Sequence, residues 1–167
     1  MGIAFMLTTP ETIRTLQRKL YRKAKQEPAY RFYALYDKVY RADILSHAYS
    51  LVRANKGSAG IDGVTFEAIE TEEGVTAFIG ELVEALRNKT YQADPVKRVM
   101  IPKSDGGQRP LGIPTIRDRV AQMAAKLVIE PIFEADFCDI SYGFRPKKSA
   151  HDAVEDVTYA LNTGYVR

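Results

Sequence analysis

One segment in the second half of the chain changes from helical to strand-like patterning, and this change most constrains the fold. Residues 96–101 read VKRVMI, a run typical of a β-strand, and residues 104–107 read SDGG, a turn. Residues 109–113 form a second strand-like run, so the segment predicts a β-hairpin. Pro102 and Pro110 cannot donate hydrogen bonds to a sheet, and we therefore expect short strands or edge strands.

Helical periodicity dominates before this hairpin. Apolar residues at helical spacing predict a helix from about residue 10 to Pro28 and a second over residues 30–55, interrupted near Arg41. A glycine-containing loop is expected over residues 57–63, followed by a third amphipathic helix over about residues 75–86. The N-terminal half is therefore expected to be helical.

Helical patterning returns after the hairpin. Thr115 followed three residues later by Asp118 predicts a capping box, with Pro131 near the end of that helix. A loop over residues 141–148 leads to a last helix over residues 149–161, which also starts with capping residues. The pattern predicts an α+β fold in which helices flank a small antiparallel hairpin.

The ten tyrosines leave a base-stacking role open. Four of them follow helical spacing, which is more typical of a core: Tyr33, Tyr36, Tyr40 and Tyr49. We therefore expect these four to pack inside the helical region.

Charge is unevenly distributed, although the formal net charge is only +3. Residues 1–41 and residues 87–126 each contain nine Lys or Arg against three acids, whereas residues 62–84 contain seven acids and no base. Two basic zones around an acidic segment favour a polyanionic partner. Solvated helix faces explain the pattern equally well from charge alone.

Composition also bears on compartment and metal binding. Cys138 is the single cysteine, which excludes an internal disulfide framework and favours a reducing compartment. No apolar run approaches the ~18 residues of a membrane span, and residues 1–10 make a poor signal peptide. We expect a cytoplasmic protein with no membrane partner. His47, His151 and the cysteine stand at unrelated positions, so no metal site is predicted.

The hairpin carries the clearest chemistry. Lys103 and Arg109 bracket its turn, so the two cations can converge on one spot, as a triphosphate requires. Gly112 allows a ligand to approach the backbone closely, and Ile113 offers a stiff apolar face to a base. An exposed hairpin with solubilising charges is the alternative, and spacing alone favours it.

Three ordered segments resemble conserved blocks of group II intron reverse transcriptases. They are NKGSAGIDGVT at residues 55–65, IPKSDGGQRPLGIP at residues 101–114 and EPIFEADFCDISYGFRPKKSAHDA at residues 130–153. The preceding region, RFYALYDKVYRADILSHAYSLVRANKG, resembles the N-terminal helices of the same family. CRISPR-associated and other bacterial reverse transcriptases share these blocks, so the subtype stays open.

The resemblance implies particular roles. It implies that Lys103 and Arg109 grip the triphosphate of an incoming dNTP, that Ile113 packs on the templating base, and that residues 56–63 cover the template. Asp62 is expected to cap the following helix instead of contacting RNA. The residues expected to contact nucleic acid are Lys56, Gly57, Gly60, Gly63, Arg117, Arg145, Lys147 and Lys148.

Several of these assignments keep an alternative. Arg117 and Arg119 either face the template or pair with Asp118 and Glu130. The lysines at positions 147 and 148 have an ordinary surface role as the alternative. Tyr142 and Phe144 are expected to be packing residues.

The resemblance also implies a domain organisation. Residues 1–55 would form an N-terminal helical extension and residues 56–167 a fingers subdomain, with palm and thumb absent. Nucleotidyl transfer uses two metal ions held by carboxylates, and no YxDD motif occurs in the chain. We expect no catalytic residue and no metal site here, with Mg²⁺ bound only in a full-length enzyme. Residues 165–166 are expected to start the strand that leads to the first carboxylate.

The expected function is the fingers portion of an RNA-directed DNA polymerase, a group II intron reverse transcriptase and maturase. Its partners would be template or intron RNA, a primer and dNTP, and the 167 residues alone would not polymerise. The alternatives are a non-catalytic intron-RNA-binding protein and part of a CRISPR or defence-associated reverse transcriptase. An exposed hydrophobic face could lead to self-association or to binding of a complementing polymerase chain.

Overall fold

A computed structural model describes residues 8–164, apart from the side chains of residues 72 and 73. The fold is α+β, as predicted, with helices around one antiparallel strand pair. The elements are α1 (Glu11–Gln26), α2 (Tyr36–Val39), α3 (Ala42–Ala54), α4 (Phe66–Ala68), a π-helical turn η1 (Ile69–Glu73), α5 (Val75–Arg87), β1 (Lys97–Pro102), β2 (Gln108–Ile113), α6 (Ile116–Asp136) and α7 (Ala150–Asn162). The strand expected at residues 165–166 lies outside the described residues.

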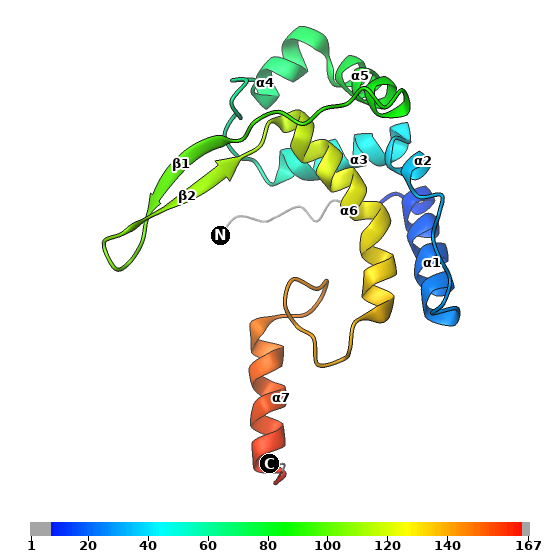
Figure 1. The fold of residues 1–167 in the computed structure, drawn as a ribbon, viewed down its shortest axis with the longest axis vertical. Coiled ribbons are helices and arrows are strands. Elements are labelled where there is room, and N and C mark those ends of the chain that lie inside the picture. The colour runs from blue at the N-terminus through cyan, green and yellow to red at the C-terminus, as the bar shows by residue number, and fades with distance from the viewer. Residues whose placement is uncertain (1–7, 165–167) are drawn as a thin grey trace.

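Helix α6 is the central element of the molecule. Helices α1 and α3 both contact α6, and α5 contacts α3. The β1–β2 hairpin and α7 project from opposite ends of α6 toward the same side, so an open space lies between them (Figure 1). In the same view α1 lies on the other side of α6 from the hairpin.

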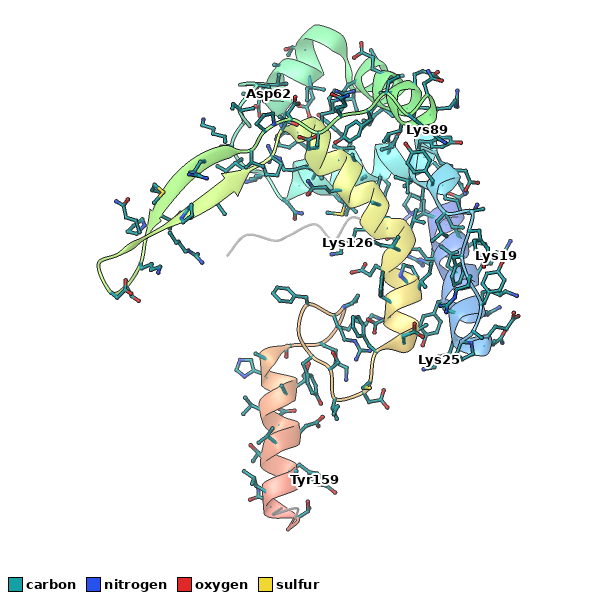
Figure 2. All side chains as sticks on the ribbon, in the orientation of Figure 1. Lys19, Lys25, Asp62, Lys89, Lys126 and Tyr159 are labelled. Atoms are coloured by element: carbon teal, nitrogen blue, oxygen red, sulfur yellow. The ribbon has the colours of Figure 1, made fainter. Side chains whose placement is uncertain are left out.

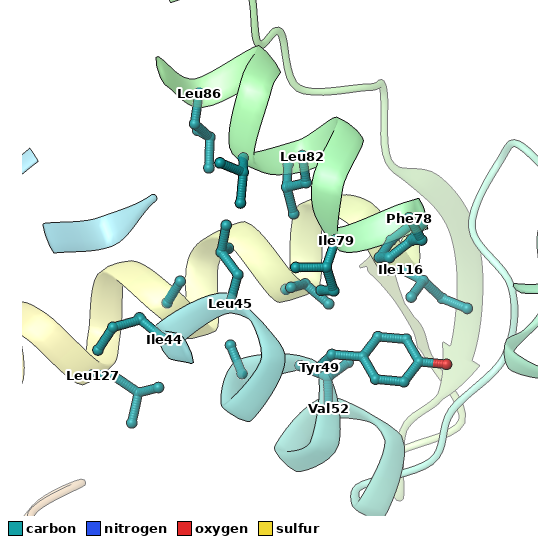
Figure 3. Close-up of a cluster of buried hydrophobic side chains, with 14 of the residues drawn as sticks. Ile44, Leu45, Tyr49, Val52, Phe78, Ile79, Leu82, Leu86, Ile116 and Leu127 are labelled. Carbon is teal, nitrogen blue, oxygen red and sulfur yellow. The ribbon is translucent and has the colours of Figure 1, made fainter. Parts of the chain in front are cut away.

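The hydrophobic core lies where α1, α3, α5 and α6 meet. Figure 3 shows side chains from three of these helices, α3, α5 and α6, in contact. The largest fully buried apolar side chains are Ile13, Ile44, Leu45, Leu82, Ile116, Val120 and Val128. Each contributes about 1.5–3 kcal/mol relative to an exposed position. The cluster has members on both sides of residue 55, and the division proposed there stays a prediction.

The predicted hairpin is confirmed. Strand β1 lies one residue later than the pattern indicated, and β2 begins one residue earlier. Strands β1 and β2 are antiparallel, and Met100 pairs with Pro110. Within the turn, the Lys103 amide donates to the Gly107 carbonyl over 2.7 Å. The described sheet has only these two strands, so each has an open edge that tolerates proline.

Residues 30–35 are not helical, which corrects the helix predicted over residues 30–55. After Pro28 the Tyr30 amide donates to the Glu27 carbonyl over 2.9 Å, forming a turn. The Tyr30 ring then packs edge-on against Phe32, and the Lys23 ammonium lies 4.3 Å from the Tyr30 ring centroid. These contacts with the end of α1 outweigh the weak helical propensity of the segment. The predicted break near Arg41 is present between α2 and α3.

The aromatic predictions are partly wrong. Tyr49 is buried as expected, but Tyr33 is 91% exposed because it lies in the non-helical segment, and Tyr36 is also exposed. Phe144 was expected to pack, yet its side chain is fully exposed and its φ is 58°. Helical spacing alone therefore does not identify which aromatic residues enter this core.

Pro131 lies near the end of α6, as predicted, and the helix continues past it to Asp136. A proline inside a helix leaves the carbonyl four residues earlier without its helical donor. That carbonyl belongs to Leu127, and the Gln17 side chain of α1 donates to it over 3.0 Å. The contact between α1 and α6 thus satisfies the group that the proline leaves unpaired.

Two of the capping predictions need correction. Thr65, not Asp62, caps α4, because its hydroxyl accepts from the Ala68 amide over 3.2 Å, whereas Asp62 accepts from the nearby Val64 amide. Helix α4 and η1 are each shorter than two helical turns, too short for a periodic pattern in the sequence to predict them. Before α6, the Thr115 hydroxyl accepts from the Asp118 amide over 3.1 Å, but the Asp118 carboxylate binds other partners.

The capping box at the start of α7 is confirmed. The Ser149 hydroxyl accepts from the Asp152 amide, and the Asp152 carboxylate accepts from the Ser149 amide over 2.7 Å. Helix α7 buries none of its residues, although Val154, Val157 and Leu161 are apolar. None of the helices in the described region is both long and apolar enough to span a bilayer.

Candidate nucleic-acid interface

The register of the hairpin brings the two predicted triphosphate ligands to one face. Side chains alternate between the two faces of a strand, and directly paired residues share a face. Ile101 pairs with Arg109, and Lys103 follows Ile101 by two residues at the point where it bonds to Gly107. Lys103 and Arg109 therefore lie on the same face, close to the turn. Both are exposed, and neither forms an ion pair with a residue that the structure describes.

The base of the hairpin arranges the remaining predicted contacts. Ile113 pairs with Lys97, so by the same alternation it shares the face of the two cations, and it is half-buried. Arg98 pairs with Gly112 and lies on the opposite face. A Cβ on Gly112 would come within 2.9 Å of a Val96 methyl group. Gly112 thus makes room for a neighbouring side chain, a reason that the sequence did not reveal.

The glycine loop is fixed to the start of α6. A Cβ on Gly60 would lie 2.6 Å from Thr115 Cα and 2.8 Å from its nitrogen, so only glycine allows this approach of two backbones. Gly57 has a φ of +117° and Gly63 a φ of +72°, both in the region that favours glycine. Lys56 has a φ of 57° and an exposed side chain. The loop consequently abuts the residues that directly follow β2.

Arg119, which was expected either to face the template or to pair with an acid, holds this loop in place. Its Nη2 donates to the Ser58 carbonyl over 2.7 Å, its Nε donates to the Thr115 carbonyl over 3.4 Å, and its guanidinium lies 5.7 Å from the Phe66 ring centroid. The contact with Ser58 joins residues 61 positions apart. No local pattern in the sequence could have indicated it.

Asp118 ties the segment before the hairpin to α6. Its carboxylate accepts from the Tyr91 hydroxyl and from the Asp94 amide, and the residue is 2% exposed. Burial, together with the hydrogen bond to this carboxylate, raises the pKa of the Tyr91 hydroxyl above its ordinary value. Arg117 lies 5.3 Å from the Tyr91 ring centroid and forms no ion pair with any described acid. The structure therefore contradicts the alternative in which Arg117 pairs with Asp118 or Glu130.

Arg145 organises the loop between α6 and α7. It forms a two-oxygen pair with Glu134, with an Nη2–Oε1 distance of 2.6 Å, and its Nη1 donates to the Cys138 and Ser141 carbonyls. The Arg145 side chain is 8% exposed, and its guanidinium holds the pKa of the Glu134 carboxyl below its usual value. Most of its donors are thus used within the protein. The template contact expected of Arg145 stays a prediction.

The two lysines of this loop differ from each other. Lys147 is exposed and has a φ of 61°. The Lys148 ammonium donates to the Asp139 carbonyl over 3.1 Å and lies 4.8 Å from the Tyr142 ring centroid. Lys147 therefore presents its charge to solvent, whereas Lys148 is partly engaged within the loop.

Five of the nine cations of the first basic zone form ion pairs with nearby acids. Arg14 and Arg18 pair with Glu11, and in the same region three further pairs form: Lys23 with Glu27, Lys38 with Asp37, and Arg41 with Asp43. This agrees with the ordinary reading of the charge pattern as solvated helix faces. Within residues 8–164, no group of three or more His, Cys, Asp or Glu side chains is arranged to hold a metal ion.

The chain is an α+β protein in which a cationic hairpin and a glycine loop meet at the start of the long helix α6. The chain is similar to protein YkfC of Escherichia coli K12, with 39% identity over 151 residues, 89% of this chain and 39% of that protein. It is 36% identical over 129 residues to the group II intron-encoded protein LtrA of Lactococcus lactis subsp. cremoris, which covers 75% of this chain and 21% of LtrA.

A third relative is the uncharacterized 91 kDa protein in the cob intron of Schizosaccharomyces pombe, 30% identical over 117 residues, 69% of this chain and 14% of that protein. No protein-family model matches the chain. The chain is thus a relative of group II intron-encoded proteins, as its three sequence blocks indicated, and it spans well under half the length of these relatives.

Proposed function

We propose that this chain is the fingers portion of an RNA-directed DNA polymerase of the group II intron reverse transcriptase and maturase type. In this role it binds template or intron RNA and the triphosphate of an incoming dNTP beside the primer end. The observation that carries the proposal is the strand register, which puts Lys103 and Arg109 on one exposed face of the hairpin. The relatedness to LtrA supports the same assignment.

The cationic face suits a triphosphate physically. An ammonium is a compact point charge, and a guanidinium offers a planar fork of N–H groups that donates to two phosphate oxygens. Neither cation is neutralised by a described acid, so no internal ion pair has to break before the ligand binds. Ile113, at the base of the same face, supplies an apolar surface against which a base can pack.

The glycine loop suits the template. It lies against the residues that follow β2, which brings Lys56 and its neighbours to the base of the hairpin. A template RNA strand with one base against Ile113 would therefore have its sugar-phosphate backbone beside this loop. This arrangement supports the expectation that the loop covers the template.

Mg²⁺ is the cofactor that the proposed polymerase reaction implies. Two-metal chemistry needs carboxylate ligands, and no group of three candidate ligands occurs among the residues described here. The described residues do not fit such a site. The part proposed for them is confined to binding and orientation, and no step is assigned to the metal.

The test compares two arginines of the same hairpin. Arg109→Gln removes a charged donor from the cationic face, whereas Arg98→Gln makes the same change on the opposite face. Charge-assisted hydrogen bonds contribute about 1.5–3 kcal/mol, so the Arg109 variant should weaken binding of a labelled dNTP by about tenfold or more. Arg98→Gln should bind as the unchanged protein does. Equal losses in both variants would sink the assignment.

Two further measurements separate the proposal from its alternative. RNA binding by the chain should weaken steeply as salt rises, because phosphate contacts release counterions. Primer extension by the 167 residues alone should be absent, and metal-dependent synthesis by them would contradict this. Salt-sensitive RNA binding without any dNTP binding would favour the non-catalytic, intron-RNA-binding protein instead.

A further inference from the structure

A small basic pocket lies between the C-terminal end of α3 and the exposed side of α6. Its volume is about 270 Å³, small compared with clefts that enclose drug-sized ligands. The lining residues are Val52, Asn55, Lys56, Arg119, Gln122, Met123 and Lys126. We propose that this pocket binds a backbone phosphate of the template strand. This inference rests on the proposed function, since it assigns a second contact to the same nucleic acid.

The charge of the pocket is the first argument. Three cations line it, and its described lining includes no acid. Another pocket of the molecule, about 340 Å³ in volume, is lined by Asp62 and Glu81 together with one arginine, Arg117. Only the first of these two pockets therefore has the sign that an anion requires. Asn55 and Gln122 add amide donors that can also bind phosphate oxygens.

The geometry of α6 is the second argument. Arg119, Gln122 and Lys126 follow one another at intervals of three and four residues, so they occupy one face of the helix. Arg119 is held in place by its bonds to the Ser58 and Thr115 carbonyls. The pocket thus has one cation held by hydrogen bonds, Arg119, and two exposed lysines, Lys56 and Lys126.

Lys126 already forms an ion pair, with Glu130, that would compete with a phosphate. Its ammonium lies 3.4 Å from a Glu130 carboxylate oxygen, and the Lys126 side chain is 59% exposed. A solvent-exposed pair of this kind is worth about 0–1 kcal/mol. A phosphate contacted by several cations at once gains more than this pair loses, so Glu130 does not prevent binding.

The position of the pocket matches the proposed path of the template. Lys56 belongs both to the pocket and to the glycine loop expected to cover the template. In Figure 2, Lys126 lies on the side of α6 that faces the open space below the hairpin, whereas Lys19 lies on the far side of α1. A template strand of nucleic acid that passes the glycine loop would reach α6 at this pocket.

The experiment measures binding of a short single-stranded RNA to the chain over a series of KCl concentrations. Fluorescence anisotropy would give the slope of log K against log salt for the unchanged chain, Lys126→Gln, and the double variant Lys56→Gln/Lys126→Gln. Each lost phosphate contact should flatten the slope by about 0.7. Lys19→Gln is the matched control, because it makes the same charge change on an exposed helix position away from the pocket.

A parallel series uses single-stranded DNA of the same sequence. A phosphate site should lose the same amount with RNA and with DNA, since both have the same backbone charge. A loss confined to RNA would mean that the pocket recognises the 2′-hydroxyl, and would overturn the phosphate assignment. An equal flattening in Lys19→Gln and Lys126→Gln would also overturn it, because the effect would then come from general surface charge.

The outcome for this pocket is separable from that for the proposed function. If the chain binds RNA with the expected salt dependence and Arg109→Gln weakens dNTP binding, the proposed function stands even when the pocket variants have no effect. If the unchanged chain binds neither RNA nor dNTP, the proposed function fails first. Far-UV circular dichroism of each variant checks that the helices remain folded.

Discussion

The helical body and the two projecting parts of this molecule differ sharply in burial. Helices α1, α3, α5 and α6 share one core, whereas α7 buries no residue and the hairpin contributes none to the core cluster. Yet the hairpin and the glycine loop at its base carry most of the residues proposed to bind ligand. Stability and the proposed function therefore reside largely in different parts of the chain.

The difference has a physical origin. A two-stranded hairpin has too few contacts to be stable alone in water, so β1 and β2 depend on their attachment to α6. That attachment is specific: the Asp118 carboxylate and the close approach of Gly60 to Thr115 fix the segments at the base of the hairpin. The body therefore positions the exposed elements as well as stabilising the molecule.

The largest expected effect contrasts two leucines. Leu82 is 1% exposed in the core and Leu161 is 60% exposed on α7. Leu82→Ala should lower the free energy of unfolding by about 2–5 kcal/mol, and Leu161→Ala should change it by less than about 0.5 kcal/mol. Denaturant unfolding followed by circular dichroism measures both. Similar losses would mean that α7 is packed in solution.

The next effect tests how the glycine loop is attached to the body. Gly60→Ala puts a Cβ within 3 Å of the Thr115 backbone, which cannot move aside as a flexible side chain can. We expect a loss of about 1–3 kcal/mol. The control is Gly80→Ala inside α5, where an added Cβ would meet nothing within 4 Å. This substitution should stabilise the helix by about 0.5–1 kcal/mol. An unchanged stability in Gly60→Ala would refute the close approach.

A smaller effect concerns pH and the core. His47 is 7% exposed, its Nε2 lacks a partner among the described residues, and burial lowers the pKa of its imidazole below the ordinary value of 6.5. Because the unfolded chain then binds the proton more readily, stability should fall as pH drops below 6.5. This histidine can add a slope of at most about 1.4 kcal/mol per pH unit.

The measurement is thermal or denaturant unfolding between neutral and mildly acidic pH. His47→Gln cannot titrate and should flatten the dependence, whatever its effect on absolute stability. His151→Gln changes an exposed position at the start of α7 and should leave the slope unchanged. A slope that persists in the His47 variant would assign the effect to other groups.

The smallest expected effect on stability concerns the exposed apolar side chains of α7 and of the C-terminal part of α6. Val154, Val157 and Leu161 on α7 and Phe133 on α6 are each about 60% exposed. We expect weak self-association through these side chains. Val157→Lys should reduce association in sedimentation velocity while changing the free energy of unfolding by less than about 0.5 kcal/mol. A chain that stays monomeric at high concentration would contradict this.

Local signals predicted a large part of the fold. The hairpin followed from two strand-like runs around SDGG, the capping box of α7 from Ser149 and Asp152, and the break between α2 and α3 from the pattern near Arg41. Each depends on residues a few positions apart. The helix predicted over residues 30–35 is absent, because a turn after Pro28 and a contact with α1 change the local preference. Pro131 lies near the end of α6 as predicted, but only the folded chain shows that Gln17 binds the carbonyl that this proline leaves unpaired.

The candidate site shows the same division. Lys103 and Arg109 could be singled out from the sequence, but only the register shows that they share a face. Arg145 looked available for RNA, yet in the folded chain Glu134 and two carbonyls engage most of its donors. Whether a cation is available depends on its folded neighbours, which spacing does not reveal.

The sequence by itself determined the order of the longer helices and the two strands, the hairpin with its two cations, and the relation to group II intron-encoded proteins. Only the tertiary structure shows that Gln17 binds a carbonyl 110 residues away and that Arg119 binds one 61 residues away. It also decides which groups donate hydrogen bonds to the Asp118 carboxylate. Turns and caps depend on residues close together in the chain. The other contacts exist only when packed helices bring distant backbone groups within hydrogen-bonding distance.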